Sequence, residues 1–194
     1  MSLRTLIVAA PRTGTTFIAN VLQAVGLDIP HERHGTDGAV GWEYAVDCNR
    51  TAWGGQRSDG AFVRVWHQTR EPLPTIASLQ TTHGYTWDWI GRHIALPADL
   101  LSRCMTTYVE WNALCERMTR DHYRVEDVRD GSETWRQICR WLGLPEDTLC
   151  PPIPTNTNTR EHAPVTWVDL RNTDPLLADR VRQTAARYGY SREG

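Results

Sequence analysis

The part of the sequence with the clearest potential for chemistry is residues 9–16, which read Ala-Ala-Pro-Arg-Thr-Gly-Thr-Thr. Apolar residues precede this stretch and a largely apolar helix pattern follows it, so the pattern predicts a tight turn between a buried strand and a helix. A helix that begins at Gly14 or Thr15 leaves its first backbone N–H groups without partners at the positive end of its dipole. We therefore expect the turn to bind a phosphate or sulfate group. An ordinary turn with a threonine cap on the helix is the alternative interpretation.

This loop differs from the nucleotide-triphosphate loop G-x-x-x-x-G-K-[ST] in ways that disfavour phosphoryl transfer. With the two patterns aligned on Gly14, Ala9 replaces the first glycine and Thr15 replaces the lysine. A loop without that lysine is poorly suited to transfer from ATP. Arg12 and the threonine hydroxyls, including that of Thr16, offer other hydrogen-bond donors to an anion.

A second pair of candidate anion ligands, Arg70 and Ser78, lies further along the chain. Residues 61–68 are rich in β-forming side chains and predict a central strand, which ends just before Arg70. Ser78 would then lie on a helix predicted over residues 73–80. Because ligands gather at the carboxyl ends of parallel strands, we expect Arg70 to lie near Arg12.

Both motifs resemble those of sulfotransferases that use 3′-phosphoadenosine 5′-phosphosulfate (PAPS). The first resembles the 5′-phosphosulfate loop of that family, and the Arg70–Ser78 element resembles its 3′-phosphate site. The family commonly has lysine where this chain has Arg12, and aspartate or asparagine where it has Glu71. All 21 basic residues of this chain are arginines, so the first departure matches its composition. The motifs cover roughly the first 80 residues.

The resemblance implies an activity. A sulfonate group would pass from PAPS to a hydroxyl or amine of a small-molecule or carbohydrate acceptor by in-line displacement, which leaves adenosine 3′,5′-bisphosphate and requires no metal. Arg12 would contact the bridging oxygen as it gains charge. The 5′-phosphate and the sulfonate would be bound by Thr13, Gly14, Thr15 and Thr16.

Two further donor-binding residues are implied by the same resemblance. Phe17 takes the place of an aromatic residue that packs on the adenine, or else it is a core residue of the first helix. Residues 156–160 resemble the late loop that closes over the donor, with Arg160 as a clamp on a phosphate. An exposed loop arginine is the other interpretation of Arg160.

Sulfonate transfer also needs a group that removes a proton from the acceptor. Glu32 is our first candidate, because it follows a short strand expected over residues 27–29, where several carbohydrate-type sulfotransferases place a catalytic glutamate. His31 is the second candidate, since a histidine titrates near neutral pH. A solvated loop in which Glu32 pairs with Arg33 or caps a helix is the alternative.

Other histidines are expected to have different roles. His31 and His34 have no third ligand close in sequence, so no metal site is predicted. His67 falls within a strand and is expected to be buried and hydrogen-bonded.

The remaining pattern predicts one α/β domain over residues 1–194. Strands alternate with helices, which favours a three-layer sandwich around a small, mainly parallel central sheet, similar to P-loop NTPases. A loop and a short helix are expected over residues 36–49. Further strands are expected at 3–9 and 122–125, and further helices at 14–25, 99–121, 132–142 and 174–188.

Composition excludes several functions and leaves others open. The net charge of −2 disfavours nucleic acid as a partner. The sequence has five cysteines without a C-x-x-C pair and no run of about 18 apolar residues, so we expect a cytoplasmic protein without a membrane span. Nine tryptophans suggest a core and a pocket built from indoles, but their number alone reveals no ligand. An acceptor pocket is expected between residues 31–41 and the aromatic segment 85–89, because aromatic faces suit a sugar ring or an apolar scaffold. A degenerate nucleotide kinase and an inactive nucleotide-binding regulator remain alternatives to the enzyme.

Overall fold

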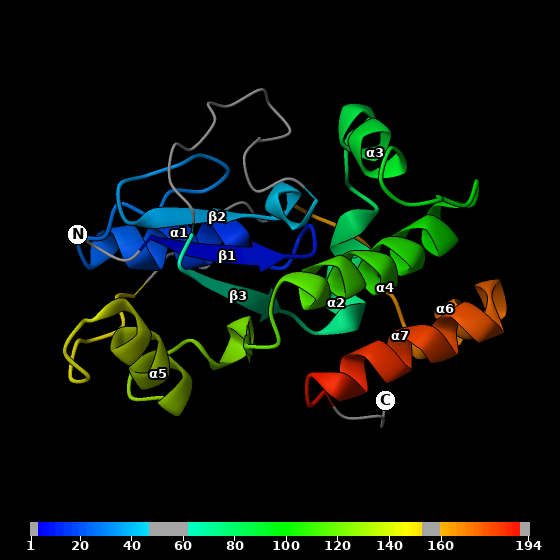
Figure 1. The fold of residues 1–194 in the computed structure, drawn as a ribbon. Coiled ribbons are helices and arrows are strands. Elements are labelled where there is room, and N and C mark those ends of the chain that lie inside the picture. The colour runs from blue at the N-terminus through cyan, green and yellow to red at the C-terminus, as the bar shows by residue number, and fades with distance from the viewer. Residues whose placement is uncertain (1–3, 47–61, 153–159, 191–194) are drawn as a thin grey trace.

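A four-stranded parallel sheet forms the centre of the protein (Figure 1). The computed structural model describes residues 4–46, 62–152 and 160–190. The strands lie in the order β2-β1-β3-β4. Their bounds are β1 (Thr5–Ala9), β2 (Gly38–Gly41), β3 (Arg64–Thr69) and β4 (His122–Arg124). Because every pair is parallel, the carboxyl ends of all four strands meet at one edge of the sheet.

Helices cover both faces of the sheet, which confirms the three-layer α/β fold (Figure 1). Side chains of β1 alternate between two cores, with Leu6 and Val8 in one and Ile7 in the other. The Ile7 face is covered by α1 (Thr15–Ala24) and α5 (Glu133–Leu142). The other face is covered by α2 (Pro72–Leu79), α3 (Gly84–Gly91), α4 (Leu100–Met118), α6 (Trp167–Thr173) and α7 (Pro175–Arg187).

Most predicted helices form close to their expected bounds. Helices α3 and α6 were not predicted, and two short 3₁₀ helices, η1 (Glu43–Ala45) and η2 (Val125–Asp127), follow β2 and β4. Within the described ranges, no helix is both long enough and apolar enough to cross a bilayer. The thiols of Cys104, Cys115, Cys139 and Cys150 are free, whereas Cys48 lies outside the described residues.

The expected strand over residues 27–29 is wrong. Residues 27–30 have no regular structure, and the strand is instead β2, where a loop had been expected. Its sequence, Gly-Ala-Val-Gly, has a low β-propensity, so the sequence pattern does not indicate a strand there. Glycine is needed at its first position because a Cβ on Gly38 would lie 1.9 Å from the backbone oxygen of Thr5. Glu32 therefore precedes β2 rather than following a strand.

His67, on β3, is buried and hydrogen-bonded as the sequence predicts. Its side chain is 1% exposed, and its Nε2 lies 2.9 Å from Oδ1 of Asn112 on α4. The amide nitrogen of Asn112 donates to the backbone oxygen of Tyr108, so the histidine is the donor in this pair. Burial lowers the pKa of His67 to about 4.

We expect His67 to weaken the fold in acid. In the unfolded chain His67 binds a proton near pH 6.5, whereas in the folded protein it does so only near pH 4. The free energy of unfolding that is present above pH 6.5 is therefore lost as the pH falls toward 4. The loss is roughly 3 kcal/mol, at about 1.4 kcal/mol for each pH unit between the two pKa values. Urea unfolding between pH 4 and 7.5 measures it. The His67→Gln variant should lack this loss, whereas a variant of the exposed His162 should follow the wild type; identical profiles for His67→Gln and wild type would contradict the assignment.

Candidate functional site

The candidate site lies at the carboxyl edge of the sheet, where the loops that follow the strands come together. In register, Ala9 of β1 lies beside Gln68 of β3, and Thr69 lies beside Arg124 of β4. On the other side of β1, Val8 lies beside Gly41, the last residue of β2. The residues after these ends are therefore neighbours in space although they are far apart in the chain.

The loop after β1 has the backbone of an anion cradle. Gly14 is the N-cap of α1 with a φ of 87°, and as a glycine it makes no side-chain cap hydrogen bond to the helix. Thr13 is buried and its hydroxyl donates to the backbone oxygen of Ala10, which closes the turn. A helix that starts in this way at the end of a central strand can present its first N–H groups to an anion.

Two buried side chains that the sequence analysis missed hold this loop in place. The amide nitrogen of Gln68 donates to the backbone oxygen of Thr13 at 2.8 Å. The hydroxyl of Tyr123, on β4, donates to the amide oxygen of Gln68, also at 2.8 Å. A chain of hydrogen bonds thus runs from β4 through β3 to the loop of β1, and its burial makes it costly to break.

Three arginines gather beside the loop. The Nε of Arg12 donates to the hydroxyl of Ser78 at 2.9 Å. Arg70 donates to the backbone oxygen of Arg12 at 3.0 Å, so the structure places both predicted ligands next to each other. Arg160 donates to the backbone oxygen of Thr81, just beyond α2.

The cations in this cluster affect one another. Burial lowers the pKa of Arg12, and the charges of Arg160 and Arg70 lower it further. Neighbouring guanidinium groups repel one another, and a ligand with several negative charges would relieve that repulsion. The cluster therefore suits a polyanion with more than one phosphate or sulfate group.

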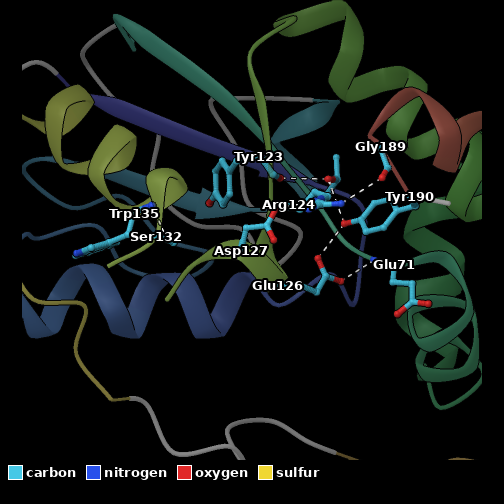
Figure 2. A network of polar contacts seen from close by, with 10 residues as sticks. Glu71, Tyr123, Arg124, Glu126, Asp127, Ser132, Trp135, Gly189 and Tyr190 are labelled. Carbon is cyan, nitrogen blue, oxygen red and sulfur yellow. Dashed lines mark hydrogen bonds and ion pairs between the residues drawn. The ribbon is translucent and has the colours of Figure 1, made fainter. Parts of the chain in front are cut away.

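The segment that carries Arg70 is fixed by a polar network around Glu126 (Figure 2). One carboxylate oxygen of Glu126 accepts the backbone N–H of Glu71 at 2.8 Å, and the other accepts the hydroxyl of Tyr190 at 2.9 Å. Arg124 donates to Gly189, the neighbour of Tyr190. Residues that are far apart in the sequence thus hold the start of α2 in place. Local sequence patterns cannot predict this arrangement.

Glu32 and His31, the two candidate bases, reach the loop from the β2 side. The hydroxyl of Thr15 lies 2.9 Å from Nε2 of His31, and that nitrogen lies 3.5 Å from Oε1 of Glu32. The same Glu32 oxygen accepts the indole N–H of Trp42 at 2.8 Å. Burial and the charge of Arg12 lower the pKa of His31, although Glu32 opposes the shift. Burial and the charge of Arg12 thus favour the neutral form of His31 beside the loop.

Two of the candidate catalytic residues, Arg12 and Glu32, have a strained backbone. Among the described non-glycine residues, Arg12 and Glu32 have a positive φ, of 68° and 52°. Such a conformation costs on the order of 1 kcal/mol or more for a residue with a side chain, and it concentrates at functional sites.

The remaining predicted residues have less distinctive surroundings. Phe17 is half-buried and packs against the core under α1. Trp87 packs in the core of the other face, Trp89 is half-buried beside His93, and Tyr85 is exposed. Residues 156–159 of the late loop lie outside the described part of the chain. That described part holds no group of three or more His, Cys, Asp or Glu side chains arranged for a metal ion.

Comparison of the chain with protein-family models, with curated proteins and with solved structures gives no match in any of the three. The chemistry of the site has two sides, with three arginines and a helix start for an anion, and a glutamate with a histidine for a proton. That combination suits the transfer of an anionic group to an acceptor that loses a proton.

Proposed function

We propose that the protein is a sulfotransferase that moves a sulfonate group from PAPS to a hydroxyl or amine of a small-molecule or carbohydrate acceptor. The observation that carries the proposal is that Arg12, Arg70 and Arg160 converge on one side of the loop while Glu32 reaches its other side through His31 and Thr15. The free thiols and the lack of a spanning helix among the described residues fit a cytoplasmic location, which is part of the proposal.

The donor would bind along the arginine side. Backbone N–H groups of residues 13–16 would hold the 5′-phosphate and the sulfonate at the start of α1. Arg70 and Ser78 would hold the 3′-phosphate, with Arg160 as a further cation. Phe17, which is half-buried, would pack on the adenine.

Transfer would then follow an in-line displacement. The acceptor oxygen or nitrogen attacks the sulfur and forms a new bond to it, while the bond from sulfur to the bridging oxygen breaks. The electron pair of that bond stays on the bridging oxygen, whose growing charge Arg12 stabilises. Glu32 takes the proton that the acceptor loses, and His31 is the alternative acceptor of that proton.

The kinase alternative is tested by nucleotide binding without metal. A kinase holds its nucleotide through Mg²⁺, whereas the arginines would hold adenosine 3′,5′-bisphosphate directly. We expect the Kd of the bisphosphate, measured by calorimetry, to change by less than about twofold when EDTA replaces Mg²⁺. Loss of binding in EDTA would favour a kinase-like protein.

A regulator that binds nucleotide without turnover differs from the enzyme in one measurement. Release of adenosine 3′,5′-bisphosphate from PAPS, followed with a panel of hydroxylated and amino acceptors, should depend on the acceptor for the enzyme. Tight bisphosphate binding without any acceptor-dependent release would favour the regulator.

A further inference from the structure

A second glutamate, Glu43, is completely buried at the end of β2. Its side chain is 0% exposed, and neither carboxylate oxygen has a hydrogen-bond partner among the described residues. The space that it occupies exists because residue 41 is glycine: a Cβ there would lie 2.7 Å from Oε2 of Glu43 and 2.8 Å from the ring of Tyr44. A buried carboxylate without partners is costly, so a carboxyl in this position is expected to keep its proton.

Glu43 has a close electrostatic neighbour in Glu32. Burial and the negative charge of Glu32 together raise the pKa of Glu43 to about 8. The two surroundings are unequal, because Glu32 accepts the indole N–H of Trp42 and its side chain is 19% exposed. A proton shared between these two carboxyls is therefore more stable on Glu43, which has neither solvent nor a hydrogen-bond partner among the described residues.

Few other charges face Glu43. Strands β1 and β2, which lie next to η1, carry no titratable side chain. On η1 itself the adjacent group is the buried Tyr44, whose ring meets the edge of His34 at 5.2 Å. Helix α4 faces η1 with Trp111, whose indole donates to the backbone oxygen of Trp42.

The charged residues of α4 lie elsewhere. Glu110 and Glu116 pair with Arg180 and Arg187 of α7, and Arg103 lies over the ring of Trp87. These contacts leave Glu32 as the main charge that acts on Glu43.

We infer that Glu32 and Glu43 form a carboxyl pair that carries one negative charge at neutral pH, with the charge on Glu32 and the proton on Glu43. The role of this pair rests on the proposed function. Burial of Glu43 keeps the charge on the group that must accept the proton of the acceptor, so Glu43 is a positioning residue. Because Glu43 is neutral, it also adds no second negative charge near the loop that would bind the anion.

The first test is a stability difference that depends on pH. The folded-state pKa of Glu43 lies above the ordinary 4.5, so the unfolded chain loses this proton first, and stability is lost as the pH rises from about 4.5 to 8. The neutral Glu43→Gln variant escapes this loss. Relative to wild type, its Tm should gain on the order of 10 °C between pH 5 and pH 8. In the matched Glu146→Gln variant, which removes an exposed ion pair, the Tm relative to wild type should show no comparable rise between these pH values. A Tm difference between Glu43→Gln and wild type that stays constant with pH would overturn the inference.

The second test uses the wild-type protein and so needs no variant to fold. If donor binding favours a protonated Glu43, adenosine 3′,5′-bisphosphate should bind with proton uptake near pH 8.5, seen by calorimetry in buffers of different ionisation enthalpy. Its Kd should rise by roughly threefold or more between pH 7 and 9, and stay flatter in Glu43→Gln. If the bisphosphate bound to wild type and to Glu43→Gln with the same proton uptake and the same pH dependence, Glu43 would have no influence on donor binding. Absence of bisphosphate binding at every pH would instead refute the proposed function, and the Tm test would still decide where the proton lies.

Discussion

Replacing Glu32 by glutamine is expected to lower the turnover number about 10²-fold or more, as for the loss of a group that takes a proton in the transition state. Glutamine keeps the size of the side chain and an oxygen that can accept the indole N–H of Trp42. It cannot accept a proton from the substrate. The Kd of adenosine 3′,5′-bisphosphate should change little, because the proposed donor site lies on the arginine side of the loop.

Steady-state kinetics and calorimetry on the same preparations measure both quantities. The Glu146→Gln variant, far from the loop in sequence and exposed, is the matched control. If Glu32→Gln weakened donor binding and left turnover intact, Glu32 would have a structural role. A larger loss of turnover in His31→Ala than in Glu32→Gln would transfer the role of base to the histidine.

Local patterns in the sequence were enough to locate the turn between β1 and α1 and the elements around it. Short apolar strands followed by turn residues and amphipathic helices predicted β1, β3 and the helices after them, because these elements depend mainly on neighbouring residues. The parallel arrangement then placed Arg70 beside Arg12, as the contact between them reports. Alternating strands and helices led to the three-layer fold in the same way.

The β2 side of the site could not be predicted in this manner. Strand β2 contains two glycines that are required by close contacts with Thr5 and with Glu43, and neither contact leaves a local signal. The short strand was therefore placed too early in the sequence, and Glu43 was not considered. Contacts between distant segments, such as Tyr123 with Gln68 and Tyr190 with Glu126, were missed for the same reason.

Replacing Arg70 by alanine is expected to abolish most of the preference for a 3′-phosphate. A charge-assisted hydrogen bond to a phosphate contributes roughly 1.5–3 kcal/mol, and Ser78 adds a second donor, so the wild type should prefer adenosine 3′,5′-bisphosphate over adenosine 5′-phosphate by roughly tenfold to several hundredfold. Loss of the contact between Arg70 and Arg12 is expected to weaken the binding of both nucleotides, so the ratio of the two Kd values is the informative quantity. The Arg171→Ala variant, on the exposed part of α6, should keep the wild-type ratio.

The most direct test of PAPS as the donor is calorimetry of the wild-type protein with these two nucleotides, which differ only in the 3′-phosphate. ATP and ADP lack that group as well, so selectivity for it separates a PAPS site from other nucleotide sites. Our account predicts that the bisphosphate binds at least about tenfold more tightly than adenosine 5′-phosphate. Equal affinity for the two ligands would contradict the assignment of Arg70 and Ser78, and with it the proposal that the protein is a PAPS-dependent sulfotransferase.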